Sequence, residues 1–372
     1  MNAIDPTLAH GHPLAAPARP TAHDRLRDKV LTITSTESAE AMAAHLDPSY
    51  EGLVITGADR LSKMRRLRRV FPELLLIAEP DSHSKFEATP DALWHLPDGE
   101  GDLLPAPTLE DILDGQRQSG ASIVLPPSGF IDVGDADTLR ATVQAANKLA
   151  GDDIAVPLYL ASGWLRPEHT NFLIAVMKLS THPVLLSFGS STNPLSTGRR
   201  HEIYRDVVVS GGVVSWRTDL AGLEALAHGA LGAAIGAAPG LRRFTPPKDS
   251  GKARRPDDPS PYVMIPRHMH YMKTGAMREE LYVSAPAPSC RCRECGGQRV
   301  DRFTEKQKDA AARHNHAVID EYARAILDAD SRRRPLVWRG MVHDALVAHE
   351  ATAATVGRPW NAPLDVTVWA ES

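Results

Sequence analysis

The chain has 372 residues, of which 42% are hydrophobic and 24% are charged, and its formal net charge is −4. This composition is typical of a soluble globular protein, and the net negative charge excludes a protein that binds nucleic acid through its overall charge. No apolar run approaches the roughly 18 residues of a transmembrane helix. The N-terminus lacks the apolar core of a signal peptide, so we expect a cytoplasmic protein with a flexible tail over residues 1–25.

Eight short apolar runs follow this tail, and each precedes polar residues and a segment of helical composition. They cover residues 30–34, 53–57, 74–78, 122–126, 155–160, 183–188, 213–216 and 232–236. Continuous apolar strands are expected in a parallel sheet that is covered on both faces. The intervening helical segments include residues 136–150 and 220–229. Eight such units over about 210 residues predict an α/β fold, a (β/α)8 TIM barrel over residues 26–262. A doubly wound sheet is the alternative, but no GxGxxG motif follows the first strand.

The composition changes after the eighth run. Residues 245–262 are rich in proline and charge, which predicts an exposed loop. Residues 263–372 are expected to form a zinc-binding and helical C-terminal region, with helices over residues 303–328 and 340–354.

The only three cysteines, Cys290, Cys292 and Cys295, lie within six residues of one another. A secreted disulfide framework would have an even number of cysteines spread along the chain. Three clustered thiolates instead predict a zinc site, and a fourth ligand would close its tetrahedron and make it structural. His314 and His316 on the following helix are the candidates for that ligand.

The CRCREC run, followed by a helix that carries His314 and Asn315, resembles the zinc site of the tRNA-guanine transglycosylase superfamily. Proteins of that superfamily are (β/α)8 barrels with a C-x-C-x2-C cluster and a later histidine after the last barrel strand. The resemblance covers roughly residues 30–330 and implies His314 as the fourth zinc ligand, with His316 as the alternative. It also implies chemistry at the N-glycosidic bond of a nucleic-acid base.

Carboxylates follow several predicted strands, where the chemistry of a TIM barrel takes place: Asp59, Glu79, Asp81, Asp132 and Asp219. Cleavage of an N-glycosidic bond develops positive charge on the sugar, and a carboxylate can stabilise this charge, attack the sugar or activate a water molecule.

The resemblance implies a catalytic role at the position of Glu79 and Asp81. At the family's second aspartate, the nucleophile, this chain has Ala234 instead. We therefore predict Glu79, Asp81 and Asp219 as the catalytic candidates, although Asp219 also directly precedes a helix and has the character of a helix cap.

Aromatic residues and glycines near three strand ends predict a pocket for an extruded base. The candidate substrate-binding residues are Ser128, Gly129, Phe130, Trp164 and Trp216, and the small polar loop 187–193 could donate further hydrogen bonds. The alternative is that these aromatic residues cap the barrel core.

Two basic stretches are candidates for contact with the nucleic-acid backbone. Residues 60–69 contain six Lys or Arg, although a solvated helix face explains this stretch equally well. The second stretch, between the barrel and the cysteines, is the better candidate and includes Arg242, Arg243, Lys248, Arg254, Arg255, Arg267 and Lys273.

The leading functional hypothesis is a zinc-containing DNA glycosylase that flips out a modified base and cleaves its N-glycosidic bond. The resemblance extends to DNA-acting branches of the superfamily, some of them associated with phage defence, so DNA is favoured over tRNA. The alternatives are a guanine transglycosylase that exchanges 7-deazaguanine bases in tRNA or DNA, and a non-catalytic nucleic-acid-binding subunit. No membrane partner is expected, and a homodimer is compatible with the sequence.

Overall fold

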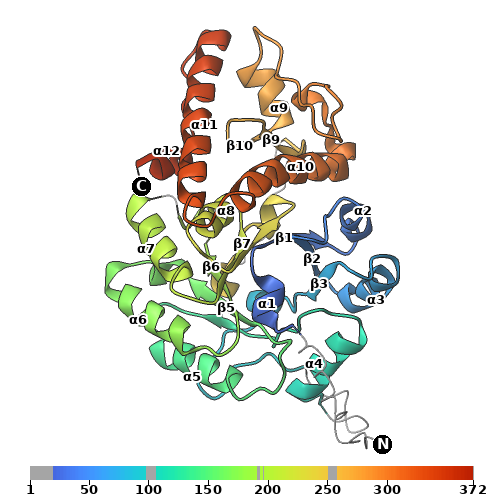
Figure 1. The fold of residues 1–372 in the computed structure, drawn as a ribbon, viewed down its shortest axis with the longest axis vertical. Helices are drawn as coiled ribbons and strands as arrows, with labels where there is room; N and C mark the ends of the chain where they lie inside the picture. Colours follow the sequence, from blue (N-terminus) through green and yellow to red (C-terminus); the bar gives the residue numbers. More distant parts are fainter. Residues whose placement is uncertain (1–19, 98–105, 191–192, 196, 250–257, 372) are drawn as a thin grey trace, which may run out of the picture.

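The computed structural model describes residues 20–97, 106–190, 193–195, 197–249 and 258–371. Eight parallel strands form one sheet in the order β3-β2-β1-β8-β7-β6-β5-β4. Figure 1 shows this sheet with the C-terminal helices α10 and α11 beside it. The strands are β1 (Lys29–Ser35), β2 (Glu51–Thr56), β3 (Leu75–Ala78), β4 (Phe130–Ile131), β5 (Val156–Ala161), β6 (Val184–Gly189), β7 (Val213–Thr218) and β8 (Gly232–Gly236). This order, with helices around the sheet, confirms the predicted (β/α)8 TIM barrel.

The barrel closes between β3 and β5 through the fourth apolar run of the sequence. Ile123 forms a parallel bridge with Ile77 of β3, and Val124 forms one with Ile154 just before β5. Pro126 and Pro127 then interrupt the run, because proline has no N–H group to donate to a ladder. The fourth strand is therefore divided, and β4 continues it beside the C-terminal end of β5.

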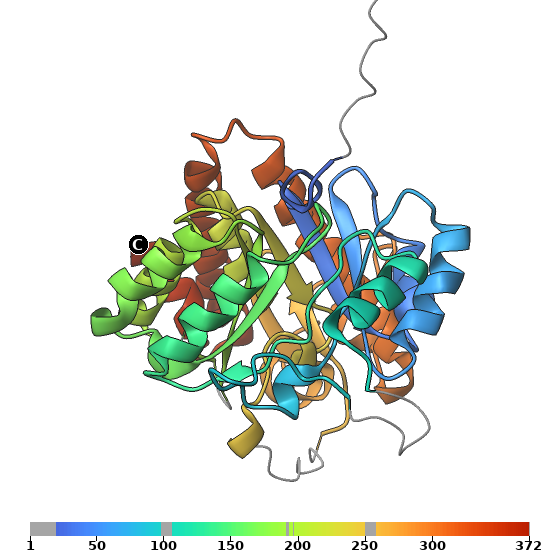
Figure 2. The ribbon, with the colours of Figure 1, turned by 90° about the horizontal axis from the view of Figure 1, so that it is seen from below.

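Helices surround the strands on the outside of the barrel (Figure 2). They are α2 (Ala39–Ala43), α3 (Arg60–Val70), α4 (Leu109–Gln118), α5 (Ala136–Ala146), α6 (Pro167–Leu179), α7 (Gly198–Val208) and α8 (Ala221–Ala227). The predicted helices 136–150 and 220–229 correspond to α5 and α8. No helix in the described part of the chain is long and apolar enough to cross a membrane.

The predicted N-terminal tail ends earlier than residue 25, because α1 (Ala22–Leu26) is part of the folded barrel. Thr21 and Asp24 form a capping box at its start. Ala22 and Leu26 lie on one face of the helix and are buried against the interior of the barrel. Residues 1–19 of the predicted tail lie outside the described residues.

The C-terminal region begins at a two-stranded antiparallel sheet. Its elements are β9 (Tyr262–Ile265), β10 (His270–Lys273), α9 (Thr274–Ala276), a π-helical turn (Met277–Leu281), α10 (Lys308–Leu327), α11 (Arg334–Val356) and α12 (Leu364–Glu371). The predicted helices 303–328 and 340–354 correspond to α10 and α11, whereas α12 was not predicted. Tyr262, at the end of the predicted exposed loop, is the first residue of β9.

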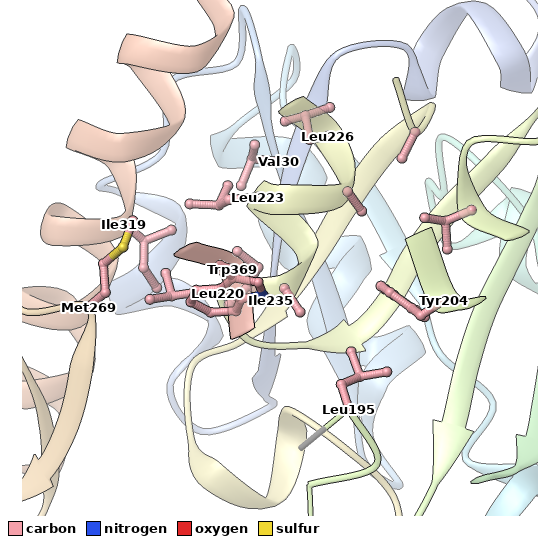
Figure 3. Close-up of a cluster of buried hydrophobic side chains, with 14 of the residues drawn as sticks. Val30, Leu195, Tyr204, Leu220, Leu223, Leu226, Ile235, Met269, Ile319 and Trp369 are labelled. Carbon is pink, nitrogen blue, oxygen red and sulfur yellow. The ribbon is translucent and has the colours of Figure 1, made fainter. Parts of the chain in front are cut away.

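Helix α8 joins the barrel to the C-terminal region. All seven of its residues are buried, as expected for a helix that is covered on every side. Leu223 and Leu226 lie near Val30 of β1, and Ile319 of α10 lies in the same hydrophobic cluster (Figure 3). Trp369 of α12 is also part of this cluster, so α12 is anchored on the barrel by buried apolar contact.

Candidate active site and metal centre

Four side chains converge after the barrel to form a candidate metal centre. Cys290, Cys292, Cys295 and His314 are buried, and their ligand atoms all lie within 4.8 Å of one another. The thiols are brought together by a tight turn in which the Cys295 N–H donates to the Cys292 carbonyl at 3.0 Å. Gly296 continues this turn with a φ of 55°, a conformation that favours glycine. Three thiolates and one imidazole are a donor set that could hold a metal ion.

The imidazole of His314 is oriented by the backbone of β9. Its Nε2 lies 2.8 Å from the Met264 carbonyl, which can only accept, so Nε2 carries the proton. Its Nδ1 is therefore the free ligand atom, 3.5 Å from the Cys292 Sγ and 3.3 Å from the Cys295 Sγ. A hydrogen bond to the remote nitrogen of a metal-binding histidine is the usual way to fix the ring.

The neighbours of His314 have different roles. Asn315 accepts from the Met264 N–H at 2.6 Å and donates to the Tyr262 carbonyl at 2.9 Å, so its amide pairs with β9 as another strand would. His316 instead points to the barrel, where its Nε2 lies 3.3 Å from Glu51 Oε1. The structure therefore places His314, and not the alternative His316, in the cluster.

Glu79, the first predicted catalytic residue, is the centre of a buried polar network. It follows β3 and is 0% exposed. It accepts from the Tyr159 hydroxyl at 2.9 Å and the Trp216 Nε1 at 2.8 Å. Arg217 donates to both carboxylate oxygens, at 2.8 and 2.6 Å. Three of these four donors meet at Oε1 and one binds Oε2, so both oxygens of the carboxylate are hydrogen-bonded.

Asp81 is attached to the same arginine. Its side chain accepts from the Thr56 hydroxyl, from the Gly57 N–H at 2.9 Å and from Arg217 Nη2 at 3.3 Å. Asp81 and Arg217 have left-handed φ values of 54° and 52°, which are costly for non-glycine residues and need support from their surroundings. These contacts favour an anchoring role for Glu79 and Asp81 over the predicted catalytic one.

The centre of the barrel mouth is filled by Phe244. Its ring lies edge-on to Tyr159 and to His83, with centroid separations of 5.5 and 5.0 Å. A Cβ at Gly189 would lie only 2.5 Å from this ring, so glycine is required there. Burial, and then the charge of Arg217, lower the pKa of His83 well below its usual value, so its ring is neutral.

All three predicted stacking residues belong to the buried core. Phe130 and Trp164 are 2% and 1% exposed, and the Trp164 Nε1 donates to the Asp132 carbonyl at 2.9 Å. Trp216 is also buried, but it forms part of a cavity wall. The structure therefore supports the core-capping alternative for Phe130 and Trp164.

Ser128 and Gly129 also have packing roles in the structure. Ser128 is buried, and its carbonyl accepts from the Ser82 hydroxyl at 2.5 Å. A Cβ at Gly129 would lie 2.5 Å from the Phe86 ring. This glycine therefore allows the segment that contains Gly129 to pack closely against the segment that contains Phe86.

A cavity of about 340 Å³ lies beside the filled mouth, near the C-terminal ends of β6, β7 and β8. Both the barrel and the C-terminal region line it. Its walls include Phe188, Trp216, Asp219, Arg242, Arg243, Tyr262, His270, Tyr271 and Asp365. Two carboxylates, three arginines (Arg217 with Arg242 and Arg243) and several aromatic rings therefore line one space.

Asp219 is both a cap for α8 and part of the cavity wall. Its Oδ1 accepts from the Ala221 N–H at 3.1 Å, which makes it a cap for α8, and its side chain lines the cavity. It follows β7 directly after Trp216, Arg217 and Thr218. Of the three predicted catalytic carboxylates, it is the one that lines this cavity.

Asp365 of α12 is a cavity carboxylate that sequence reasoning missed. Its Oδ2 accepts from Asn193 Nδ2 at 2.7 Å. Burial, and then the charge of Asp219, raise the pKa of Asp365 to about 6, against the opposing effects of His201 and Asn193. Asp365 lies far beyond the last barrel strand, and only the apolar spacing of α12 could have indicated that this segment folds onto the barrel.

The predicted basic stretch 242–273 is divided between several environments. Arg242 and Arg243 line the cavity, and Arg267 is exposed on another face of the C-terminal region. Lys248 forms surface ion pairs with Glu87 at 2.9 Å and Asp132 at 3.4 Å.

Three further predicted contacts with the nucleic-acid backbone remain. Lys273 donates to the Asp258 carbonyl and contributes to a separate cavity near the ends of β1 and β8. Arg254 and Arg255 lie outside the described residues.

Residues 60–69 form most of α3. Arg68 is engaged with the barrel, because it donates to the Gly120 carbonyl at 2.9 Å and to the Ser122 hydroxyl at 2.7 Å. Arg65, Arg66 and Arg69 are exposed on the solvent side of the helix. This arrangement agrees with a solvated helix face.

Comparison with known proteins adds little to this picture. No protein-family model and no curated protein matches the chain. Two mutants of the tryptophan synthase alpha-subunit from Pyrococcus furiosus are similar at 12% and 13% identity, each with a TM-score of 0.32, over 56% of this chain and 87% of theirs. A protein from Aquifex aeolicus VF5 is similar at 10% identity with a TM-score of 0.29, over 57% of this chain and 84% of its own. Such low scores carry no functional argument.

The metal centre can be tested by replacing its ligands. We expect Cys292→Ser to reduce bound metal from about one ion per chain to near zero, because three ligands no longer close the site. His316→Gln, two residues from His314, should retain the metal. Mass spectrometry of the purified proteins measures both. Retention of a full equivalent of metal by Cys292→Ser would contradict this assignment.

The anchoring role of Glu79 predicts a large loss of stability. Glu79→Gln leaves the buried guanidinium of Arg217 with only the more distant carboxylate of Asp81, at 3.3 Å, and should lower the free energy of unfolding by about 3 kcal/mol. Glu40→Gln, an exposed change of the same chemistry on α2, should shift it by less than about 0.5 kcal/mol. Chemical denaturation followed by fluorescence compares the two variants, and equal midpoints would exclude the anchoring role.

Proposed function

We propose that this protein is a nucleic-acid glycosylase, with DNA favoured over tRNA, that extrudes a modified base and hydrolyses its N-glycosidic bond. The observation that supports this most strongly is the shared cavity of Asp219 and Asp365 at the C-terminal end of the barrel strands. Enzymes that cleave glycosidic bonds usually use two carboxylates in different environments.

The two carboxylates divide the acid and base work of the reaction. Asp365, with its pKa raised to about 6, holds a proton at mildly acidic pH and gives it to the nitrogen of the departing base. The C–N bond breaks and its electron pair goes to that nitrogen. Asp219 stabilises the positive charge on the sugar and takes a proton from the water molecule that attacks the anomeric carbon.

The cavity suits one nucleotide. Its volume of about 340 Å³ lies near the lower end of the range of about 300–1,000 Å³ for small-molecule sites. The rings of Phe188 and of the exposed Tyr262 in its walls offer apolar surface to a base. Arg242 and Arg243 supply positive charge for an anionic substrate.

Glu79 supports this chemistry as a positioning residue. It binds Trp216 and Arg217, which precede Asp219 by three and two residues in the chain. By holding both side chains, Glu79 fixes the end of β7 from which Asp219 extends into the cavity. A site that is held by rigid neighbours loses less entropy when the substrate binds.

We assign zinc to the cysteine cluster, with a structural role. Cys290, Cys292, Cys295 and His314 would hold it, and four protein ligands leave no open position for a substrate. The ion would fix α10 against β9, because His314 and Asn315 both bind the backbone of β9. Strands β9 and β10 in turn supply part of the cavity wall.

Detection of abasic sites tests the proposed reaction. The protein would be incubated with modified phage DNA, plain DNA and tRNA, and aldehyde groups would be labelled. We expect abasic sites in modified DNA and a rate at least about 100-fold lower for Asp219→Asn, because a charge-stabilising carboxylate is lost. Asp59→Asn, on an exposed residue before α3, is the matched control.

Each alternative function gives its own result in this assay. Absence of abasic sites on every substrate would overturn hydrolysis. Incorporation of labelled guanine without abasic sites would indicate base exchange, with Asp219 as the nucleophile. Salt-dependent binding without base release or exchange would indicate a non-catalytic subunit.

The pH dependence of the rate tests the assignment of Asp365 as the acid. The groups around it are Asp219 after β7, His201 on α7, Asn193 and Arg243. Since only the protonated form can donate, the single-turnover rate should fall about tenfold per pH unit as pH rises well above 6. Asp365→Asn should be slow and should lose this fall. An unchanged pH profile in that variant would assign the proton donor to another group.

A further inference from the structure

Three polar atoms in the walls of the cavity have no hydrogen-bond partner among the described residues. They are Arg242 Nη2, His270 Nδ1 and the Tyr271 hydroxyl, all of them buried. An unpaired buried polar group costs about 1–3 kcal/mol, so native proteins rarely retain several at one place without a use for them. All three atoms belong to residues that line the same cavity, which points to a bound group as their missing partner.

Arg242 is held in place before any ligand arrives. Its guanidinium lies 3.4 Å from the centroid of the Tyr271 ring, and its Nε donates to the Gly236 carbonyl at 3.1 Å. A side chain at Gly236 would collide with the backbone of Leu241 and Arg242, so the chain turns back closely here. A stacked and partly bonded guanidinium loses little freedom when it binds an oxyanion.

The two neighbours on β10 are neutral and polar. Burial raises the pKa of Tyr271, so its hydroxyl stays protonated and is available to donate. Burial, and then the nearby His349 and His268, lower the pKa of His270 to about 4, so its ring is uncharged near neutral pH. One cation beside two neutral polar groups matches an oxyanion of single negative charge.

We propose that Arg242, His270 and Tyr271 form the subsite for a phosphodiester next to the scissile glycosidic bond, an inference that rests on the proposed function. The same cavity carries Asp219 and Asp365, which repel a phosphate and suit the sugar instead. Cationic and anionic residues in one cavity match a nucleotide, whose phosphate and anomeric carbon lie on different sides of the sugar. Guanidinium groups bind phosphate oxygens with charge-assisted hydrogen bonds.

A base-free probe tests this subsite without knowledge of the base. The probe is a three-residue DNA strand whose middle residue is a tetrahydrofuran abasic analogue, compared with versions that have a neutral methylphosphonate on either side of it. For the wild-type protein, one of the two methylphosphonate versions should bind about tenfold more weakly than the unmodified probe, as expected for loss of a charged hydrogen bond. Isothermal titration calorimetry measures each dissociation constant.

Variants assign this effect to the three residues. In Arg242→Gln the methylphosphonate and phosphodiester probes should bind equally. Tyr271→Phe retains the ring beneath the guanidinium and should weaken binding of the phosphodiester probe several-fold. Arg332→Gln, an exposed residue between α10 and α11, should behave as wild type. Equal binding of all probes by the wild-type protein, or an undiminished methylphosphonate effect in Arg242→Gln, would overturn the subsite.

The result is separable from the test of base excision, because the probe has no glycosidic bond to cleave. If binding of the probe depends on its charge but no abasic sites form in DNA, the phosphodiester subsite stands and the glycosylase proposal fails. If abasic sites form but the methylphosphonate has no effect on binding, the glycosylase proposal stands and the subsite fails. If inorganic phosphate displaces the probe at equal concentration, the ligand of the subsite is free phosphate and the assignment of a phosphodiester is wrong.

Discussion

Glu79 and Arg217 form a desolvated ion pair that joins β3 to β7 across the mouth of the barrel, and the position of the cavity depends on it. Two buried charges are tolerated only when they are paired and hydrogen-bonded, and Tyr159 and Trp216 supply the remaining bonds. The pair and Phe244 fill the place where a barrel of this class usually binds its substrate. The free space therefore lies to one side, where Asp219 ends β7.

The C-terminal region completes this displaced site. It provides Tyr262, His270 and Tyr271 from the β9–β10 sheet and Asp365 from α12. The cysteine cluster holds one side of this assembly, and the apolar contacts of Trp369 hold α12 on the other. Without the C-terminal region, the cavity would have only one of its two carboxylates and would lack the part of its wall that β9, β10 and α12 supply.

Sequence reasoning found the features that are encoded locally. Apolar runs predicted the strands because a parallel strand that is covered on both faces must be apolar throughout. Clustered thiols predicted the candidate metal centre because few structures other than metal sites bring three thiols so close together. The surroundings of Glu79 and Asp219 were not encoded locally. Glu79 acquires its four donors from β5 and β7, and Asp365 reaches Asp219 only because α12 folds back onto the barrel. Such contacts depend on tertiary packing.

The hydrogen bonds from His314 and Asn315 to β9 have an evolutionary consequence. They make the cysteine cluster and the cavity share one strand, since Tyr262 lies at the start of β9 and the Met264 carbonyl accepts the hydrogen bond from His314. A descendant that lost its cysteines would have to rebuild this strand's support before the cavity wall could form again. Inheritance of the cysteine cluster and of the cavity should therefore be coupled.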